Sequence, residues 1–69
     1  EITFYPNPTD SKVNFTQAIE KVEVIDLTGK TIFTFSNVRT INIESLPSGA
    51  YYLRLTNDEK TIMQKVIKQ

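Results

Sequence analysis

Apolar and polar residues alternate over short runs along this chain, and turn-forming residues separate the runs. Alternation with a period of two places successive side chains on opposite faces of a strand. Short runs at this spacing are typical of β-sandwiches and β-barrels. The pattern predicts seven strands, at residues 2–5, 12–15, 21–27, 31–35, 40–43, 50–56 and 61–68. Because no segment shows a sustained helical period, the sequence predicts an all-β fold, a seven-stranded antiparallel Ig-like β-sandwich.

The breaks between the predicted strands carry turn-forming residues. Pro6 and Pro8 end the first run because proline has no N–H group to donate to a neighbouring strand. Residues 16–20 are predicted to form a loop, and Ser36-Asn37 a turn. Thr28-Gly29 predicts a two-residue hairpin turn, since glycine tolerates a positive φ.

The predicted strand at 50–56 has the most regular alternation in the chain. It places Tyr51, Leu53 and Leu55 on the core face, and Tyr52 and Arg54 on the solvent face. Leu46, in the preceding loop, is predicted to plug the core. The strand at 21–27 is less regular, because Val24 and Ile25 are apolar and adjacent. Either both faces are covered there, or a bulge shifts the register.

Composition limits how the chain can be stabilised. With 69 residues it forms one domain, residues 1–69, and an apolar core of this size leaves a small stability margin. The chain has no cysteine and no histidine, so neither a disulfide nor a zinc site of the usual kind can hold it together. It begins directly in a strand pattern, and we therefore interpret it as a fragment of a larger protein.

Charge and residue types exclude several classes of function. Eight Lys and Arg residues balance eight Asp and Glu residues, and the signs are interspersed, which argues against a nucleic-acid partner. No apolar run approaches the roughly 20 residues that span a bilayer. Without histidine or cysteine, carboxylate pairs are the remaining catalytic candidates. Glu23 and Asp26 are too close in sequence to face each other across a substrate, and the carboxylates at 44 and 58–59 lie in predicted loops, so the sequence predicts no catalytic site, no metal site and no cofactor. Asp26, beside a turn, is predicted to accept hydrogen bonds from backbone N–H groups.

Two features leave alternatives open. A row of exposed aromatic rings would indicate a carbohydrate-binding face, but Phe4, Phe15, Phe33 and Tyr51 are predicted to lie in the core, which leaves Tyr52 and the region of Phe35. The predicted last strand carries Lys65 and Lys68, which either protect an exposed sheet edge from unwanted pairing or form a basic patch that a partner binds.

Four short motifs, none specific alone, follow one another along the chain. In order they are Tyr5-Pro6-Asn7-Pro8, Asp26-Leu27-Thr28-Gly29-Lys30, Leu46-Pro47-Ser48-Gly49-Ala50-Tyr51-Tyr52 and Lys65-Val66-Ile67-Lys68. Their order and spacing resemble the type A C-terminal sorting domain of type IX secretion substrates, and the resemblance covers essentially the whole chain. Members of that family often carry glycine in the last hairpin turn, where this chain has Asn57-Asp58-Glu59-Lys60.

The resemblance divides the motif residues into two groups. Structural motif residues would be Pro6, Asn7, Pro8, Asp26, Gly29 and Lys30. Recognition residues would be Gly49, Tyr51, Lys65, Val66, Ile67 and Lys68, with Gly49 as a bend and the two lysines as exposed positive points. A receptor is expected to add a strand to the exposed edge of this last hairpin.

The resemblance also implies a function and a route. It implies a bacterium of the Bacteroidetes group and a non-catalytic signal that directs a folded cargo from the periplasm through the type IX outer-membrane translocon, to the cell surface or into the medium. Expected partners are translocon and shuttle components and a sortase-like surface peptidase that usually removes the domain. A strand-exchanged homodimer remains open. The alternative is an accessory β-sandwich for carbohydrate binding or adhesion.

Overall fold

This computed structural model describes residues 2–69 of the chain. These residues contain five β-strands joined in one sheet. They are β1 (Phe4–Tyr5), β2 (Lys12–Ile25), β3 (Thr31–Asn42), β4 (Gly49–Asn57) and β5 (Lys60–Lys68). All paired strands are antiparallel. Residues 2–69 contain no helix, and hence none able to cross a membrane. The all-β antiparallel prediction is confirmed, but the prediction of seven strands is wrong.

Two long strands account for the difference. β2 joins the predicted strands at 12–15 and 21–27, and β3 joins those at 31–35 and 40–43. Their register shifts between Asn14 and Ile19, so the pair bends there instead of ending. Ser36 and Asn37, predicted to form a turn, lie within β3 on the other side of this bend. The positive φ of 55° at Asn37 shows that the backbone is locally irregular there, although the strand continues.

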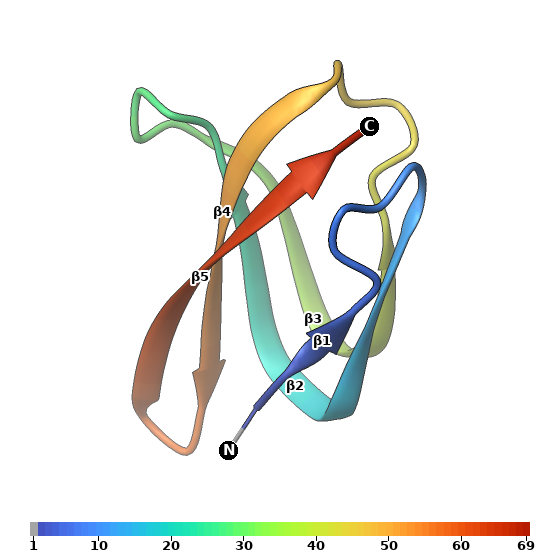
Figure 1. Cartoon of the computed structure of the whole chain (residues 1–69). Helices are drawn as coiled ribbons and strands as arrows, with labels where there is room; N and C mark the ends of the chain where they lie inside the picture. The colour runs from blue at the N-terminus through green and yellow to red at the C-terminus, as the bar shows by residue number, and fades with distance from the viewer. Residues whose placement is uncertain (1) are drawn as a thin grey trace.

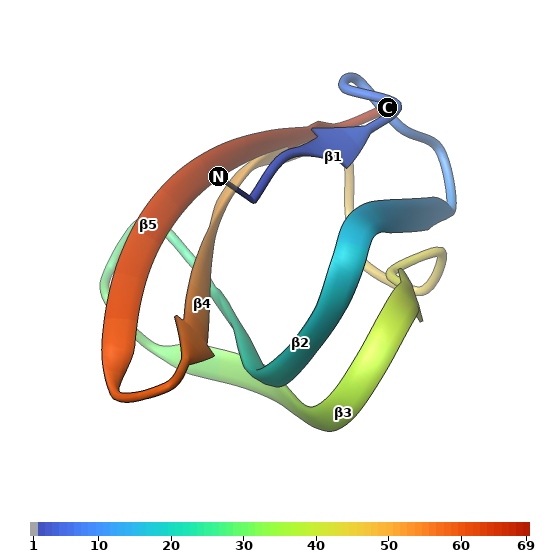
Figure 2. The same cartoon turned by 90° about the horizontal axis from the view of Figure 1, so that it is seen from below.

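β2 organises the sheet because its two halves have different neighbours. The half before the bend lies between β1 and β3, and the half after it lies between β3 and β4. β5 completes the sheet by pairing with β4. The predicted sandwich of two separate sheets is therefore replaced by one sheet that curls into a half-barrel (Figure 2). β1 and β5, the first and last strands of the chain, run in the same direction on one side of the molecule (Figure 1).

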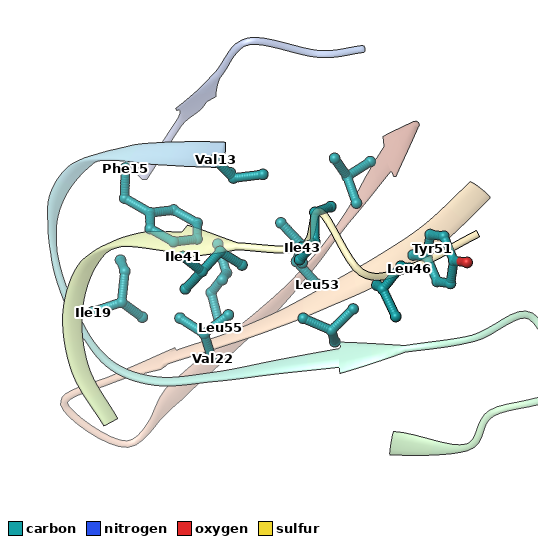
Figure 3. Close-up of a cluster of buried hydrophobic side chains, with 12 residues drawn as sticks. Val13, Phe15, Ile19, Val22, Ile41, Ile43, Leu46, Tyr51, Leu53 and Leu55 are labelled. Atoms are coloured by element: carbon teal, nitrogen blue, oxygen red, sulfur yellow. The ribbon is translucent and has the colours of Figure 1, made fainter. Parts of the chain in front are cut away.

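The concave face of this sheet holds the apolar core (Figure 3). Tyr51, Leu53 and Leu55 of β4 point into it as predicted, and Leu46 is buried below the sheet. The cluster also contains Val13, Phe15, Ile19, Val22, Val24, Ile41, Ile43 and Val66, with Phe4, Phe33 and Phe35 packed against it while only partly buried. Burying one such aliphatic side chain contributes about 1.5–3 kcal/mol. This core is the main stabilising element of a chain without disulfides.

Two explanations were open for the adjacent apolar residues Val24 and Ile25, a covered second face and a register shift, and both apply. β2 keeps a regular register with β4, in which Val24 faces Leu53 and Ile25 faces Tyr52. The shift is in β3, where Ile32 is inserted between the partners of these two residues. Ile25 points to the convex face yet is only 3% exposed, and it lies outside the main cluster. The sheet is therefore covered on both faces at this end.

Gly49 begins β4 with a φ of 150°, in the region that favours glycine. No atom lies within 4 Å of the position that a Cβ would occupy, so a side chain there would meet backbone strain but no collision.

Replacing Gly49 with valine is expected to lower the free energy of unfolding by about 1–3 kcal/mol, the usual cost of a residue held in a sparsely populated backbone region. Urea unfolding of the purified domain measures the change. Ser48→Val is the matched control, because Ser48 is an exposed neighbour without a positive φ. Equal stability of the Gly49 variant and the wild-type domain would show that the backbone there is not restricted.

Candidate recognition site at the last strand

The two edges of β5 have different partners. Asn57 and Lys60 flank the two-residue turn at residues 58–59, where both φ angles are positive, and they therefore form a hydrogen-bonded pair. The alternation of an antiparallel ladder then fixes every later residue of β5. Ile62, Gln64, Val66 and Lys68 direct their backbone groups towards β4, while Thr61, Met63, Lys65 and Ile67 direct theirs to the opposite edge.

Residues 7–9 cover the second edge along its C-terminal half. Asn7 Oδ1 accepts a hydrogen bond of 2.9 Å from Ile67 N–H, and Asn7 Nδ2 donates one of 3.2 Å to Lys65 O. Thr9 N–H donates to Ile67 O at 2.9 Å, and Thr9 O accepts from Gln69 N–H at 2.8 Å. The Asn7 carboxamide thus takes the place of a peptide group in a short parallel ladder.

The local sequence suits this position. Pro6 and Pro8, both preceded by cis peptide bonds, leave no N–H group unpaired beside the edge. Thr9 is buried, and its hydroxyl donates to Lys12 O at 2.6 Å and accepts from Ser11 N–H at 3.2 Å. The buried polar atoms of this segment are therefore satisfied, and the first and last motifs of the sequence form one structural unit.

The structure separates the predicted recognition residues by face. Gly49 and Lys65 are exposed and Ile67 is half-buried, whereas Tyr51 and Val66 belong to the core. Lys68 was predicted to be exposed, which is wrong: it is only 8% exposed, and its Nζ donates to Gln69 O at 2.8 Å. Lys65 and Lys68 lie three positions apart in a strand, so they must point to opposite faces.

A surface that sequence reasoning did not identify surrounds Lys65. Across the β4–β5 ladder, Lys65 faces Tyr52, and Met63 faces Arg54. These four side chains form the convex face of the last hairpin. Arg54 Nη1 lies 3.3 Å from Glu23 Oε1 of β2, an ion pair near the surface that contributes little to stability but holds the arginine in place. Cross-strand pairing of 50–56 with 61–68 would have identified these neighbours from the sequence.

Asp26 forms a self-contained turn between β2 and β3. Its Oδ1 accepts hydrogen bonds from the Thr28 hydroxyl at 2.6 Å, from Thr28 N–H at 2.9 Å and from Lys30 N–H at 3.0 Å. The hydroxyl of Thr28 is the main reason that the pKa of Asp26 lies below its ordinary value of 3.8, followed by Lys30 N–H. The predicted hydrogen-bonding role of Asp26 is confirmed.

The connection itself differs from the prediction. Asp26 N–H donates to Lys30 O at 2.9 Å, and Gly29 N–H donates to Asp26 O at 3.0 Å. The connection therefore has three residues, 27–29, between Asp26 and Lys30, and not the predicted two. Gly29 has the expected positive φ, 92°. Within residues 2–69, no three acidic, histidine or cysteine side chains are grouped so that they could hold a metal ion.

Comparison with protein families places this arrangement in a known group. The profile of the secretion system C-terminal sorting domain matches residues 3–69, which include residues 7–9, the Asp26 turn and all of β5. The chain belongs to this family. It is accordingly a type IX secretion sorting domain, of a family that is non-catalytic and serves export through the outer membrane to the surface or the medium. A comparison with curated proteins finds no match.

Replacing Asn7 of the sorting domain with alanine removes both side-chain hydrogen bonds to β5. We expect a loss of about 1–3 kcal/mol in the free energy of unfolding, and faster hydrogen exchange at Ile67 N–H. Asn7→Asp is the matched variant, because it keeps the acceptor for Ile67 N–H and loses only the donor to Lys65 O. It should fall between the wild type and Asn7→Ala. Unchanged exchange at Ile67 in Asn7→Ala would contradict the pairing.

Asp26 gives the sorting domain a stabilising contribution with a definite pH dependence. Because its pKa is lower in the folded than in the unfolded chain, the contribution is complete above the ordinary value of 3.8 and is lost as pH falls through the folded pKa. Asp26→Ala should therefore lower the melting temperature at pH 7, and the difference from wild type should shrink below pH 3.8. Asp10→Ala, at an exposed aspartate that makes no side-chain hydrogen bond within residues 2–69, is the control. A difference that persists unchanged at low pH would refute the carboxylate's role.

Proposed function

We propose that residues 1–69 form a single domain at the C-terminal end of a larger secreted protein, and that this domain directs the folded cargo from the periplasm through the type IX outer-membrane translocon. Shuttle components and the translocon bind it, and a sortase-like surface peptidase then usually removes it. The observation that supports this proposal is the fixed last strand, which β4 holds on one edge and residues 7–9 hold on the other.

A fixed strand suits recognition because the partner need not order it on binding. Immobilising a flexible segment costs conformational entropy, which reduces the affinity of the complex. Here the backbone entropy is already lost when the domain folds, and the β4–β5 ladder fixes the backbone positions from which Lys65 and its neighbours project. The domain therefore functions as a folded export signal for its cargo.

The predicted recognition residues divide into contact and support roles. Lys65 contacts the receptor, and Gly49 and Ile67 border the same region. Tyr51, Val66 and Lys68 support it from the buried face. The Tyr51 hydroxyl donates to Pro47 O at 2.7 Å, which fixes the loop that leads into Gly49. Pro6, Asn7 and Pro8 hold the other edge of β5, and Asp26, Gly29 and Lys30 close the hairpin between β2 and β3.

The alternative of a carbohydrate-binding or adhesion module depends on exposed aromatic rings. Within residues 2–69, Tyr5 and Tyr52 are the exposed aromatics, at 59% and 36%. The phenylalanines pair with one another against the core, Phe4 with Phe15 and Phe33 with Phe35. The four phenylalanines therefore offer no exposed aromatic platform for a sugar, and this burial favours the sorting role.

Export of a reporter fused ahead of the domain tests the proposal in a bacterium with type IX secretion. Deleting residues 63–69 removes most of β5 and uncovers Tyr51 and Leu53, so we expect the reporter to stay inside the outer membrane. Lys65→Glu keeps the fold and reverses one exposed charge, and should reduce surface delivery about tenfold. The amount of reporter accessible to external protease is the measurement.

Lys12→Glu is the matched control, because Lys12 is exposed in the half of β2 that does not pair with β4. It should be exported like the wild type. Normal delivery of the fusion that lacks residues 63–69 would defeat the proposal, since no intact last strand would then be needed.

A further inference from the structure

Residues 7–9 leave the first half of the outer edge of β5 uncovered. Within residues 2–69, the structure gives no hydrogen-bond partner to the N–H and C=O groups of Thr61 and Met63, or to Lys65 N–H. By the alternation of the ladder, all of these groups point away from β4. The edge therefore presents a row of free donors and acceptors that ends where Asn7 begins.

A second uncovered edge belongs to β1. Thr16 N–H donates to Thr3 O at 3.0 Å, which makes Thr3 and Thr16 a hydrogen-bonded pair, and the next pair along the ladder is Phe4 with Phe15. The backbone groups of Phe4 consequently point away from β2. Between the two edges lies a groove of about 290 Å³, lined by Ile2, Thr3, Phe4, Asn7, Gln64 and Lys65. We call this groove the β1–β5 slot.

The slot lies between two strand edges that both carry backbone groups without a partner within residues 2–69. β1 and β5 run in the same direction along its two sides (Figure 1), and the curl of the sheet brings these end strands together on one side of the half-barrel (Figure 2). Asn7 closes it at one end through its bonds to Lys65 and Ile67. Towards the start of β5, a second groove of about 420 Å³ shares Ile2 with the slot. Its lining combines apolar Leu55 and Ile62 with charged Asp58 and Lys60.

We infer that the β1–β5 slot binds one extended segment of a partner protein, which adds to the edge of β5 as a further strand and carries a carboxylate opposite Lys65. Among residues 2–69, Lys65 is the only charged residue that lines the slot, so an acidic side chain complements it. Side chains of the added strand that point to the other face would meet Ile2 and Ile62 and should be apolar. The ligand is thus an alternating apolar and polar segment.

A lone segment fits the slot better than a second folded copy of the domain. The edge of another copy would bring its own neighbouring strand with it, and β1 already occupies the far side of the slot. Proteins usually protect open edges with charged residues. Here Lys65 stands at the closed end and Lys60 at the start of the strand, while Thr61 and Met63 between them are uncharged. The inference rests on these hydrogen-bonding edges and not on the proposed role in export.

Hydrogen exchange measured by NMR on the whole chain tests the inference. The probe is a blocked nonapeptide of alternating valine and threonine with glutamate at its centre. In the free domain, the amides of Thr61, Met63 and Lys65 should exchange fast, whereas those of Ile62 and Gln64, paired with β4, should be protected. Saturation with the peptide should protect all three fast amides. Absence of binding, or protection confined to other strands, would overturn the inference.

Two variants locate the binding. Met63→Pro removes one outward N–H group and should weaken peptide binding about tenfold, whereas Met63→Ala keeps that group and should stay within about twofold of wild type. If Met63→Pro does not fold, a synthetic chain with an N-methyl group on Met63 replaces it. Equal affinity of the N-methylated or proline form and wild type would refute the site.

Charge and self-association provide the remaining controls. Lys65→Glu should reverse the preference, so that a peptide with lysine at its centre binds better than the one with glutamate. If wild type and Lys65→Glu both bind the glutamate peptide better than the lysine peptide, residue 65 does not recognise a carboxylate. Protection of Thr61, Met63 and Lys65 in the free domain that increases with its concentration would assign the edge to a second copy and overturn the inference.

Discussion

Hydrogen bonds between residues 7–9 and β5 decide how the whole molecule is closed. They join the first motif of the sequence to the last, and Asn7 and Ile67 are 60 positions apart in the chain. Without them, β5 would be held by β4 alone, and a two-stranded ribbon at the end of a sheet is only marginally stable. With them, the C-terminal half of β5 has hydrogen-bond partners on both of its edges.

This closure matters more here than in a larger protein. The core is a single apolar cluster, and the chain has no disulfide to limit the unfolded state. The contribution of Val66, which is fully buried, depends on β5 staying in the sheet. Edge pairing and core packing therefore support each other: the edge keeps Val66 in place, and the buried side chains keep the strand next to residues 7–9.

Local patterns predicted those features that depend on neighbouring residues only. The period of two at 50–56 placed Tyr51, Leu53 and Leu55 correctly, and Asp26 beside Gly29 predicted a hydrogen-bonded turn. The bend near Asn14 and Ile19 could not be read in the same way, because a strand pair bends or ends according to what its other half packs against. Nor does any local signal connect Asn7 to Lys65. By contrast, the error at Lys68 was avoidable, since strand alternation alone assigns it to the buried face.

A sorting domain has two requirements that conflict. Its signal must be rigid enough to be recognised on a folded cargo, yet some part of it must remain available for the partner. The structure divides these requirements along one strand. From Lys65 O onward, residues 7–9 satisfy the outer edge of β5, while from Thr61 to Lys65 N–H the same edge is open. The closed half supplies the order that makes the open half a defined surface, because a free edge on a fraying strand would have no fixed spacing of donors and acceptors. Order at the chain end and access beside it therefore come from the same short segment that begins at Asn7.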